Sequence, residues 1–229
     1  MKLLITQSNY IPWKGYIDSI AVVDKVVLYD DMQFTKRDWR NRNIIKTPQG
    51  LKWLTIPVEV KGKFNQKINE TKISDPNWNI AHLNLLKQNY KHSKCYKDVI
   101  DWIETIYLNC KFTYLSEINL YFLTEILKFL KIETDLIDSR SFILKGDKTE
   151  KLINICKDIG VNKYFTGPAA KEYLDESLFS NNNIEVNYFD YVGYKVYPQL
   201  YGDFNHNVSI LDLIFNCGNY SNNFVKSIK

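Results

Sequence analysis

The sequence predicts an α/β protein with a mainly parallel, Rossmann-like sheet flanked by helices. Short apolar runs typical of buried strands, such as residues 2–7 (KLLITQ) and 25–29 (KVVLY), alternate with segments of helical periodicity towards both ends of the chain. Alternation of this kind favours a parallel sheet. We expect two additions to it, a β-hairpin near 43–58 and a helical insertion at about 76–130.

The first quarter of the chain contains most of the predicted strands. Residues 16–23 have the pattern of an amphipathic helix, and the turn 47–50 (TPQG) predicts a hairpin. The expected strands of this part are 2–7, 25–29, 43–47 and 51–58.

The rest of the chain alternates helices and strands. Asp75, followed by Pro76, is a good helix start, and Asp147 with Glu150 forms a D-x-x-E capping box. The expected helices are 76–90, 96–109, 116–130, one that follows Asp147, 169–179 and 208–216. The expected strands are 134–137, 162–165 and 184–189.

Composition limits the class of protein. The 229 residues suffice for one large domain or two compact ones, and a hydrophobic content of 45% excludes disorder. The formal net charge of +4 is too small to indicate nucleic-acid binding by itself. Positive charge is concentrated locally instead, between Lys36 and Lys46.

The cysteines and the N-terminus predict a soluble, cytoplasmic protein. The four cysteines form no C-x-x-C pair, so reduced thiols are expected. Only four apolar residues precede Gln7, too few for a signal peptide or membrane anchor. No histidine and cysteine spacing predicts a metal site, and no glycine-rich fingerprint predicts a cofactor, so neither is expected.

Three predicted strands end near polar residues, at Gln7, Asp30 and Thr166. In open parallel sheets, ligands bind beyond the carboxyl ends of the strands. We therefore expect the loops that follow these strands to converge on one binding edge. After the first strand, Gln7 and Asn9 offer amides for a ligand, whereas Trp13 can equally fill the core.

Residues 29–43 (YDDMQFTKRDWRNRN) are the most informative segment of the sequence. Adjacent carboxylates point to opposite faces of an extended chain, so at most one of Asp30 and Asp31 should face a ligand while the other makes a structural bond. The ligand-facing group could act as a general base, a metal ligand or a partner of a ribose or ammonium group. The alternative is a pair of turn-capping carboxylates.

The arginines of this segment suit phosphate, because guanidinium groups bind its oxygens bidentately. Arg37 and Arg42 are sufficient for a diphosphate. Two alternatives remain open. The loop can be a solvated basic segment whose arginines pair with Asp30 or Asp31, or Phe34 and Trp39 can stack on RNA bases.

Two further candidates lie on predicted helices. His82 shares a helical face with apolar residues, which is more typical of a core residue than of a catalyst, although histidine is the natural proton carrier near neutral pH. Asp212 and Asn216 form a polar stripe with Ser209 on an apolar helix. Because an unpaired buried carboxylate is prohibitive, we expect Asp212 to meet an arginine of the 37–42 loop or the ligand.

Five blocks in chain order resemble the WbqC-like protein family: QSNYIPWKGY (7–16), DDMQFTKRDWRNRN (30–43), WLTIPV (53–58), YFTGPAAKEYLD (164–175) and SILDLIFNCG (209–218). The resemblance implies a single domain over 1–229. It also implies recurrent polar residues at Gln7, Asn9, Tyr10, Asp30, Asp31, Gln33, Lys36, Arg37, Asn41, Arg42, Asn43, His82, Asp212 and Asn216.

Members of this family resemble transferases of bacterial surface-polysaccharide (O-antigen, lipopolysaccharide) synthesis that place glycine or a related acyl group on a deoxyamino sugar. The hypothesis for this chain is amide formation on a nucleotide-linked amino sugar, with Asp30, Asp31 or His82 as base and Trp13 and Trp39 packing the rings. The donor could be an aminoacyl-tRNA, an acyl phosphate or adenylate, or a thioester. A non-catalytic nucleotide-sugar-binding or assembly partner and an RNA-binding protein are the alternatives, and a homo-oligomer is compatible with the sequence.

Overall fold

The computed structural model describes residues 1–228 and is built around a five-stranded sheet. The strand order is β5-β2-β1-β6-β7, and each neighbouring pair is parallel. The strands are β1 (Lys2–Thr6), β2 (Lys25–Leu28), β5 (Asp135–Asp138), β6 (Lys163–Thr166) and β7 (Glu185–Tyr188). The predicted α/β class with a parallel sheet is confirmed.

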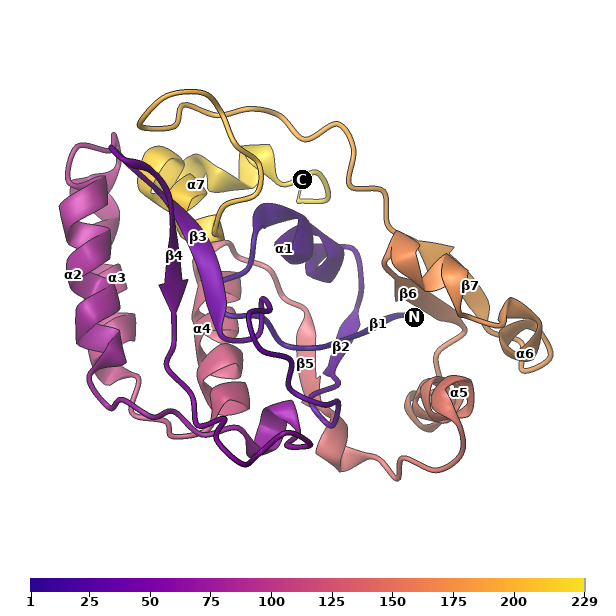
Figure 1. Ribbon diagram of the computed structural model, residues 1–229. Helices are drawn as coiled ribbons and strands as arrows, with labels where there is room; N and C mark the ends of the chain where they lie inside the picture. The colour runs from indigo at the N-terminus through magenta and orange to yellow at the C-terminus, as the bar shows by residue number, and fades with distance from the viewer. Residues whose placement is uncertain (229) are drawn as a thin grey trace.

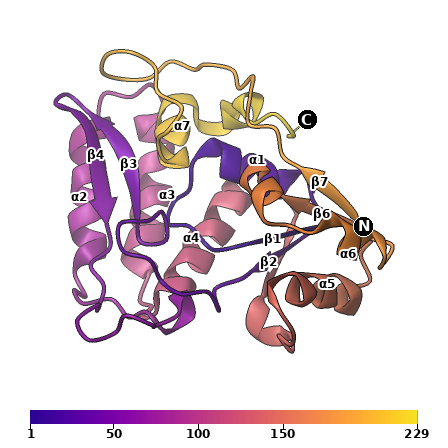
Figure 2. The same cartoon turned by 45° about the vertical axis from the view of Figure 1, so that its right-hand side comes forward.

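Helices cover both faces of this sheet (Figures 1 and 2). The α-helices are α1 (Lys14–Ala21), α2 (Trp78–Tyr90), α3 (Tyr96–Asn109), α4 (Leu115–Phe129), α5 (Lys148–Ile159), α6 (Glu176–Ser180) and α7 (Ile210–Cys217). Short 3-10 helices are η1 (Ile68–Glu70), η2 (Ser139–Ser141), η3 (Pro168–Glu172) and η4 (Gly218–Phe224). The helices α2 to α4 lie between the hairpin and β5 along the chain, where the insertion was predicted.

Alternate residues of the central strands enter two separate cores, because successive side chains of a strand point to opposite faces. Leu4 and Val26 belong to the larger cluster, which includes buried residues of α1 to α4 and α7. Leu3 and Val27 belong to the smaller cluster, which contains buried residues of α5 and α6. The sheet is therefore wound on both faces, as in a Rossmann-like fold.

The predicted hairpin is confirmed as a separate two-stranded sheet, β3 (Arg42–Thr47) and β4 (Gly50–Thr55). Gly50 has a φ of +103°, a conformation that glycine adopts without steric cost, and it closes the turn. Ile45 and Leu54 are fully buried in the same core as the helices, so the hairpin is packed against the body of the protein.

Two predicted helix boundaries are wrong. Asn77, not Asp75, is the N-cap of α2, because the Asp75 carboxylate accepts the Asn77 N–H in a turn before the helix. Residues 169–179 form no single helix but divide into η3 and α6, separated by a turn. The capping box of α5 is confirmed, since the Asp147 side chain accepts the Glu150 N–H and the Glu150 side chain accepts the Asp147 N–H.

The order of the strands gives the sheet a switch point. From β1 the chain builds β2 and then β5 on one side, and returns to the other side of β1 for β6 and β7. The direction of winding thus reverses between β1 and β6, and open α/β sheets bind ligands at such a switch point. An irregular segment, 189–208, crosses the top of the molecule from β7 to α7 (Figure 1). No helix within residues 1–228 is long and apolar enough to cross a membrane.

Candidate functional site

The loops after β1 and β2 are joined by Asp30. Its side chain is only 4% exposed, and its carboxylate accepts the Ser8 N–H at 2.8 Å. Burial raises the pKa of Asp30, although bonds from Ser8 and the charge of Arg40 act in the opposite direction. Asp30 therefore supplies the structural bond that was expected of one member of the carboxylate pair.

Asp31 has a different environment and is half-buried. Its carboxylate accepts hydrogen bonds from the Ser139 hydroxyl at 2.7 Å and from the Lys67 ammonium at 3.2 Å. Burial alone would raise the pKa of Asp31, but bonds from Ser139, Lys67 and Asn69 outweigh it and lower the pKa. Asp31 is thus an ionised, positioned carboxylate at the ends of β2 and β5.

Arg40 braces the loop that follows β1. One guanidinium nitrogen donates to the Gln7 carbonyl at 3.3 Å, the Ser8 carbonyl at 3.3 Å and the Asn9 side-chain oxygen at 2.5 Å. The Asn9 amide nitrogen and the Gln7 side chain have no hydrogen-bond partner among residues 1–228, so both amides are available to a ligand. We name Gln7, Asn9, Asp30, Asp31 and Arg40 the strand-end site.

The basic loop 36–42 follows this site, and some of its cationic side chains have partners within the described part of the chain whereas others have none there. Arg42 donates to the Arg37 carbonyl, and its guanidinium lies 3.9 Å from the centre of the Trp53 ring. Lys36 and Arg37 are exposed, and neither forms an ion pair with any residue of 1–228. The alternative that Arg37 or Arg42 pairs with Asp30 or Asp31 is wrong, and the free cations remain candidates for phosphate.

Aromatic rings of the two predicted stacking residues have different surroundings. Trp39 is 40% exposed and lies against Trp53, with ring centroids 5.3 Å apart. Trp13 is half-buried and packs against Tyr191 and Tyr194 at the start of α1. Trp39 can therefore stack on a ligand, whereas Trp13 mainly fills space beneath the 189–208 segment.

Gln33 is exposed and donates to the Phe64 carbonyl at 2.9 Å. Asn41 and Asn43 are buried and donate from their side chains to main-chain carbonyls, Asn41 to Ile56 and Asn43 to Tyr10 and Ile11. These amides connect the hairpin to neighbouring loops. Their bonds leave Asn41 and Asn43 with a bracing role and little access to a ligand.

His82 lies in the core, apart from the strand-end site. Its ring nitrogens are within hydrogen-bond distance of the Tyr10 hydroxyl, at 2.9 Å, and the Thr55 carbonyl, at 3.1 Å. Tyr10 also bonds the Tyr107 hydroxyl at 2.7 Å. Burial lowers the pKa of His82 to about 4, so the ring is neutral at physiological pH. With both nitrogens occupied, His82 and Tyr10 have the arrangement of satisfied core residues.

Asp212 has no arginine partner within residues 1–228, and the expectation of a bond to an arginine of the 37–42 loop is wrong. Its fully buried carboxylate accepts bonds from the hydroxyls of Tyr90 and Tyr197, both at 2.8 Å, and from the Gln199 amide at 2.9 Å. Burial raises the pKa of Asp212, although these hydrogen bonds act in the opposite direction. Asn216 donates to the Asp212 carbonyl at 2.7 Å. This cluster holds α7 to the 189–208 segment and is separate from the strand-end site.

The four cysteines are free and buried, and burial raises the pKa of each. The pKa of Cys217 is about 12, which leaves almost no thiolate near neutral pH. A cysteine nucleophile is not supported. Within residues 1–228 no cluster of histidine, cysteine and acidic side chains could hold a metal ion.

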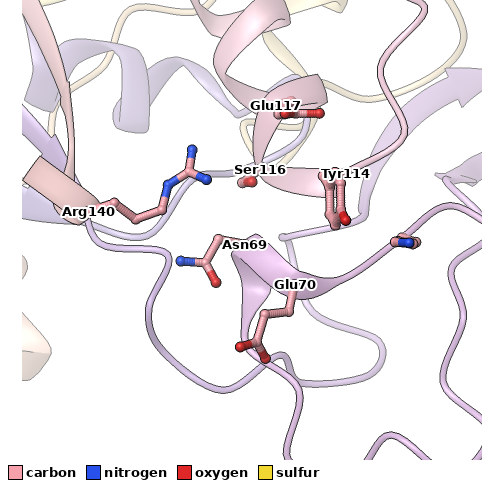
Figure 3. A pocket seen from close by; sticks show the side chains of 7 residues that line it. Asn69, Glu70, Tyr114, Ser116, Glu117 and Arg140 are labelled. Atoms are coloured by element: carbon pink, nitrogen blue, oxygen red, sulfur yellow. The ribbon is translucent and has the colours of Figure 1, made fainter.

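A pocket of about 390 Å³ adjoins the strand-end site (Figure 3). It is lined by Asn69, Glu70, Lys72, Tyr114, Ser116, Glu117 and Arg140. The Asn69 N–H donates to the Asp30 carbonyl at 3.1 Å, which connects the pocket to the end of β2. Sequence reasoning missed this pocket, because its residues come from η1, the start of α4 and η2. The only signal for the pocket in the sequence was the predicted strand that ends near Asp138, because the loop after this strand joins those after β1 and β2 at the same edge of the sheet.

Comparison with known proteins gives a family. A model of the WbqC-like protein family matches residues 7–223. The uncharacterized protein Rv1507c of Mycobacterium tuberculosis is 50% identical over 217 residues, which span 95% of this chain and 94% of that protein. No solved structure shows significant similarity to the chain.

Proposed function

Because the chain belongs to the WbqC-like protein family, we propose that it transfers an acyl or aminoacyl group to the amino group of a nucleotide-linked amino sugar in surface-polysaccharide synthesis. The observation that carries the proposal is the linked carboxyl ends of β1 and β2 beside the switch point, where Asp30 accepts the Ser8 N–H and Arg40 donates to the Gln7 carbonyl and the Asn9 side chain. Such edges of parallel sheets are where nucleotide ligands bind.

Asp31 is the proposed base. Amide formation requires the amine in its neutral form for attack, and the nitrogen loses a further proton once its bond to the donor carbonyl forms. The ionised carboxylate held by Ser139 and Lys67 can pair with the sugar ammonium and accept this further proton, which is more acidic than a proton of the free ammonium. Asp30 is too buried for this role, and His82 is in the core, so neither remains in the proposed mechanism.

The remaining groups bind and orient. Lys36 and Arg37, which have no acidic partner, suit the diphosphate. The exposed ring of Trp39 can stack on the base or sugar. The free amides of Gln7 and Asn9 can donate to the carbonyl oxygen of the acyl group, where negative charge develops during attack. The leaving group of the donor departs with the electron pair of the broken bond.

RNA binding is a second candidate function, and one observation favours it. Trp39, Trp53 and Arg42 form an exposed aromatic and basic surface on the hairpin side of the loop. Surfaces of this composition bind single-stranded RNA by stacking and by phosphate contacts. This candidate is compatible with transfer from an aminoacyl-tRNA, in which case both functions use one protein.

Thermal unfolding of the purified protein with UDP-glucosamine, UDP-glucose, UDP and tRNA tests these assignments. A ligand at a hundred times its dissociation constant stabilises the fold by about 2.7 kcal/mol. We expect stabilisation by UDP-glucosamine that is weakened in Arg37→Met and Asp31→Asn. Mass spectrometry then follows amide formation with aminoacyl-tRNA, acyl phosphate and thioester donors. Binding without product with every donor would identify a non-catalytic partner, and stabilisation by tRNA alone would favour RNA binding.

A further inference from the structure

The pocket beside the strand-end site begins at an uncapped helix terminus. Tyr114 is the N-cap residue of the fifteen-residue helix α4, and no side chain caps the helix. The N–H groups of Ser116 and Glu117 have no acceptor among residues 1–228, whereas those of Leu115 and Ile118 bond to Thr71 and Tyr114. Free N–H groups at a helix start favour an anionic group.

Ser116 supplies an independent observation. It is only 9% exposed, lines the pocket, and its hydroxyl forms no hydrogen bond within residues 1–228. Its oxygen is accessible from the pocket, where a ligand can complete its hydrogen bond. Figure 3 shows Arg140 extending from η2 towards Ser116. Hydroxyl, guanidinium and helix terminus thus surround one end of the cavity, where a ligand atom would complete the missing bonds.

The pocket also holds charges of both signs. Lys72 lies 5.2 Å from the centre of the Tyr114 ring and forms no ion pair within residues 1–228. Glu117 likewise has no cationic partner within that range, and Glu70 lines the opposite wall (Figure 3). Arg140, by contrast, is paired with Asp138. One free cation and one free carboxylate therefore face the same cavity.

A ligand with only a negative charge would leave the carboxylate of Glu117 without a cationic partner, and a ligand with only a positive charge would leave the ammonium group of Lys72 without an anionic partner. We propose that the pocket binds a small zwitterion, with its anionic group at Ser116, Arg140, Lys72 and the start of α4, and its ammonium group at Glu117. A volume of about 390 Å³ accommodates either an α-amino acid or an amino-sugar phosphate, which share this pair of charges.

Calorimetric titration of the full-length protein distinguishes the sources. The probes are glycine and glucosamine 1-phosphate. Acetate and N-acetylglucosamine 1-phosphate retain the anionic group without the ammonium, and ethylammonium retains the cation alone. We expect saturable binding of at least one zwitterion, and at least tenfold weaker binding of its single-charge analogues. The zwitterion that binds identifies the source.

Substitutions localise the binding. Glu117→Gln and Lys72→Met should each weaken the zwitterion at least tenfold, and Ser116→Ala should weaken it to a smaller extent. Glu104→Gln and Lys97→Met, on α3 and outside the lining of the pocket, remove the same charges and should leave zwitterion binding unchanged. Equal binding of single-charge analogues, no binding of either zwitterion, or equal effects of pocket and α3 variants would overturn the inference. The titration contains no acyl donor and measures binding alone, so its result does not depend on whether the protein is a transferase.

Discussion

Replacement of Arg40 by methionine should destabilise the protein, because Arg40 is a bracing residue and not a phosphate ligand. Its side chain is 15% exposed, and one nitrogen donates to three oxygens of the loop after β1. The Gln7 carbonyl retains the Tyr16 hydroxyl at 2.9 Å as a donor, so only the Ser8 carbonyl and the Asn9 side chain lose theirs.

The expected cost follows from these two acceptors. A hydrogen bond from a charged donor contributes about 1.5–3 kcal/mol, and the loop is near enough to solvent for water to replace part of each. The pair with Asp38, at 3.6 Å, adds little because Asp38 is partly exposed. We therefore expect Arg40→Met to lower the free energy of unfolding by about 2–4 kcal/mol, since methionine retains most of the apolar stem.

Arg37→Met is the matched control. The Arg37 side chain is exposed, and the bond from Arg42 goes to its main-chain carbonyl, which the substitution keeps. Surface changes of this kind alter stability by less than about 0.5 kcal/mol. In urea unfolding, Arg40→Met should lower the midpoint by about 1 M with an unchanged slope, and Arg37→Met should not shift it. Equal midpoints for the two variants would refute the division between bracing and free arginines.

Three further predictions concern buried groups. Burial lowers the pKa of His82 to about 4, so the neutral ring stabilises the fold above its unfolded pKa near 6.5, and about 3 kcal/mol of this stability is lost as the pH falls towards 4. In urea unfolding, His82→Gln should flatten this part of the pH profile of stability, and an unchanged profile would contradict the prediction. Burial raises the pKa of Asp212, so the contribution of this side chain to stability declines as the pH rises through that pKa. The difference in unfolding free energy between wild type and Asp212→Asn should therefore shrink from pH 4 to pH 7, and growth of this difference would show that the pKa is lowered instead. The four buried thiols should react with Ellman's reagent only slowly in the native protein and fully in urea. A thiol that reacts rapidly in the native state would contradict this prediction and support a cysteine nucleophile.

Periodicity identified the fold because each strand and helix carries its own local signal. Residues 25–29 and 96–109 were placed within one residue of β2 and α3. The helix expected at 169–179 failed because Asp175 caps a new helix: its side chain accepts the Ser177 N–H at 3.0 Å, so α6 begins directly after it. The start of α2 moved because Asp75 caps a turn, a use of aspartate that resembles helix capping in sequence.

The site was harder to predict than the fold. Convergence of the loops after β1 and β2 followed from parallel strands, and the opposite directions of Asp30 and Asp31 followed from extended geometry. Partners of Asp212 could not be predicted, since Tyr90 and Tyr197 are distant in sequence and hydroxyl donors replaced the expected arginine. The pocket at α4 was missed for the same reason: its charges are ordinary surface residues until the fold brings three segments together.

Hydrogen exchange with and without UDP-glucosamine tests most directly whether the segments after β1 and β2 form one ligand site. We predict slower exchange at residues 7–9 and 31–40 on binding, and unchanged exchange in α7, where Asp212 serves packing. Protection of α7 with none at 7–9 and 31–40, or no protection at all at saturating ligand, would contradict the account.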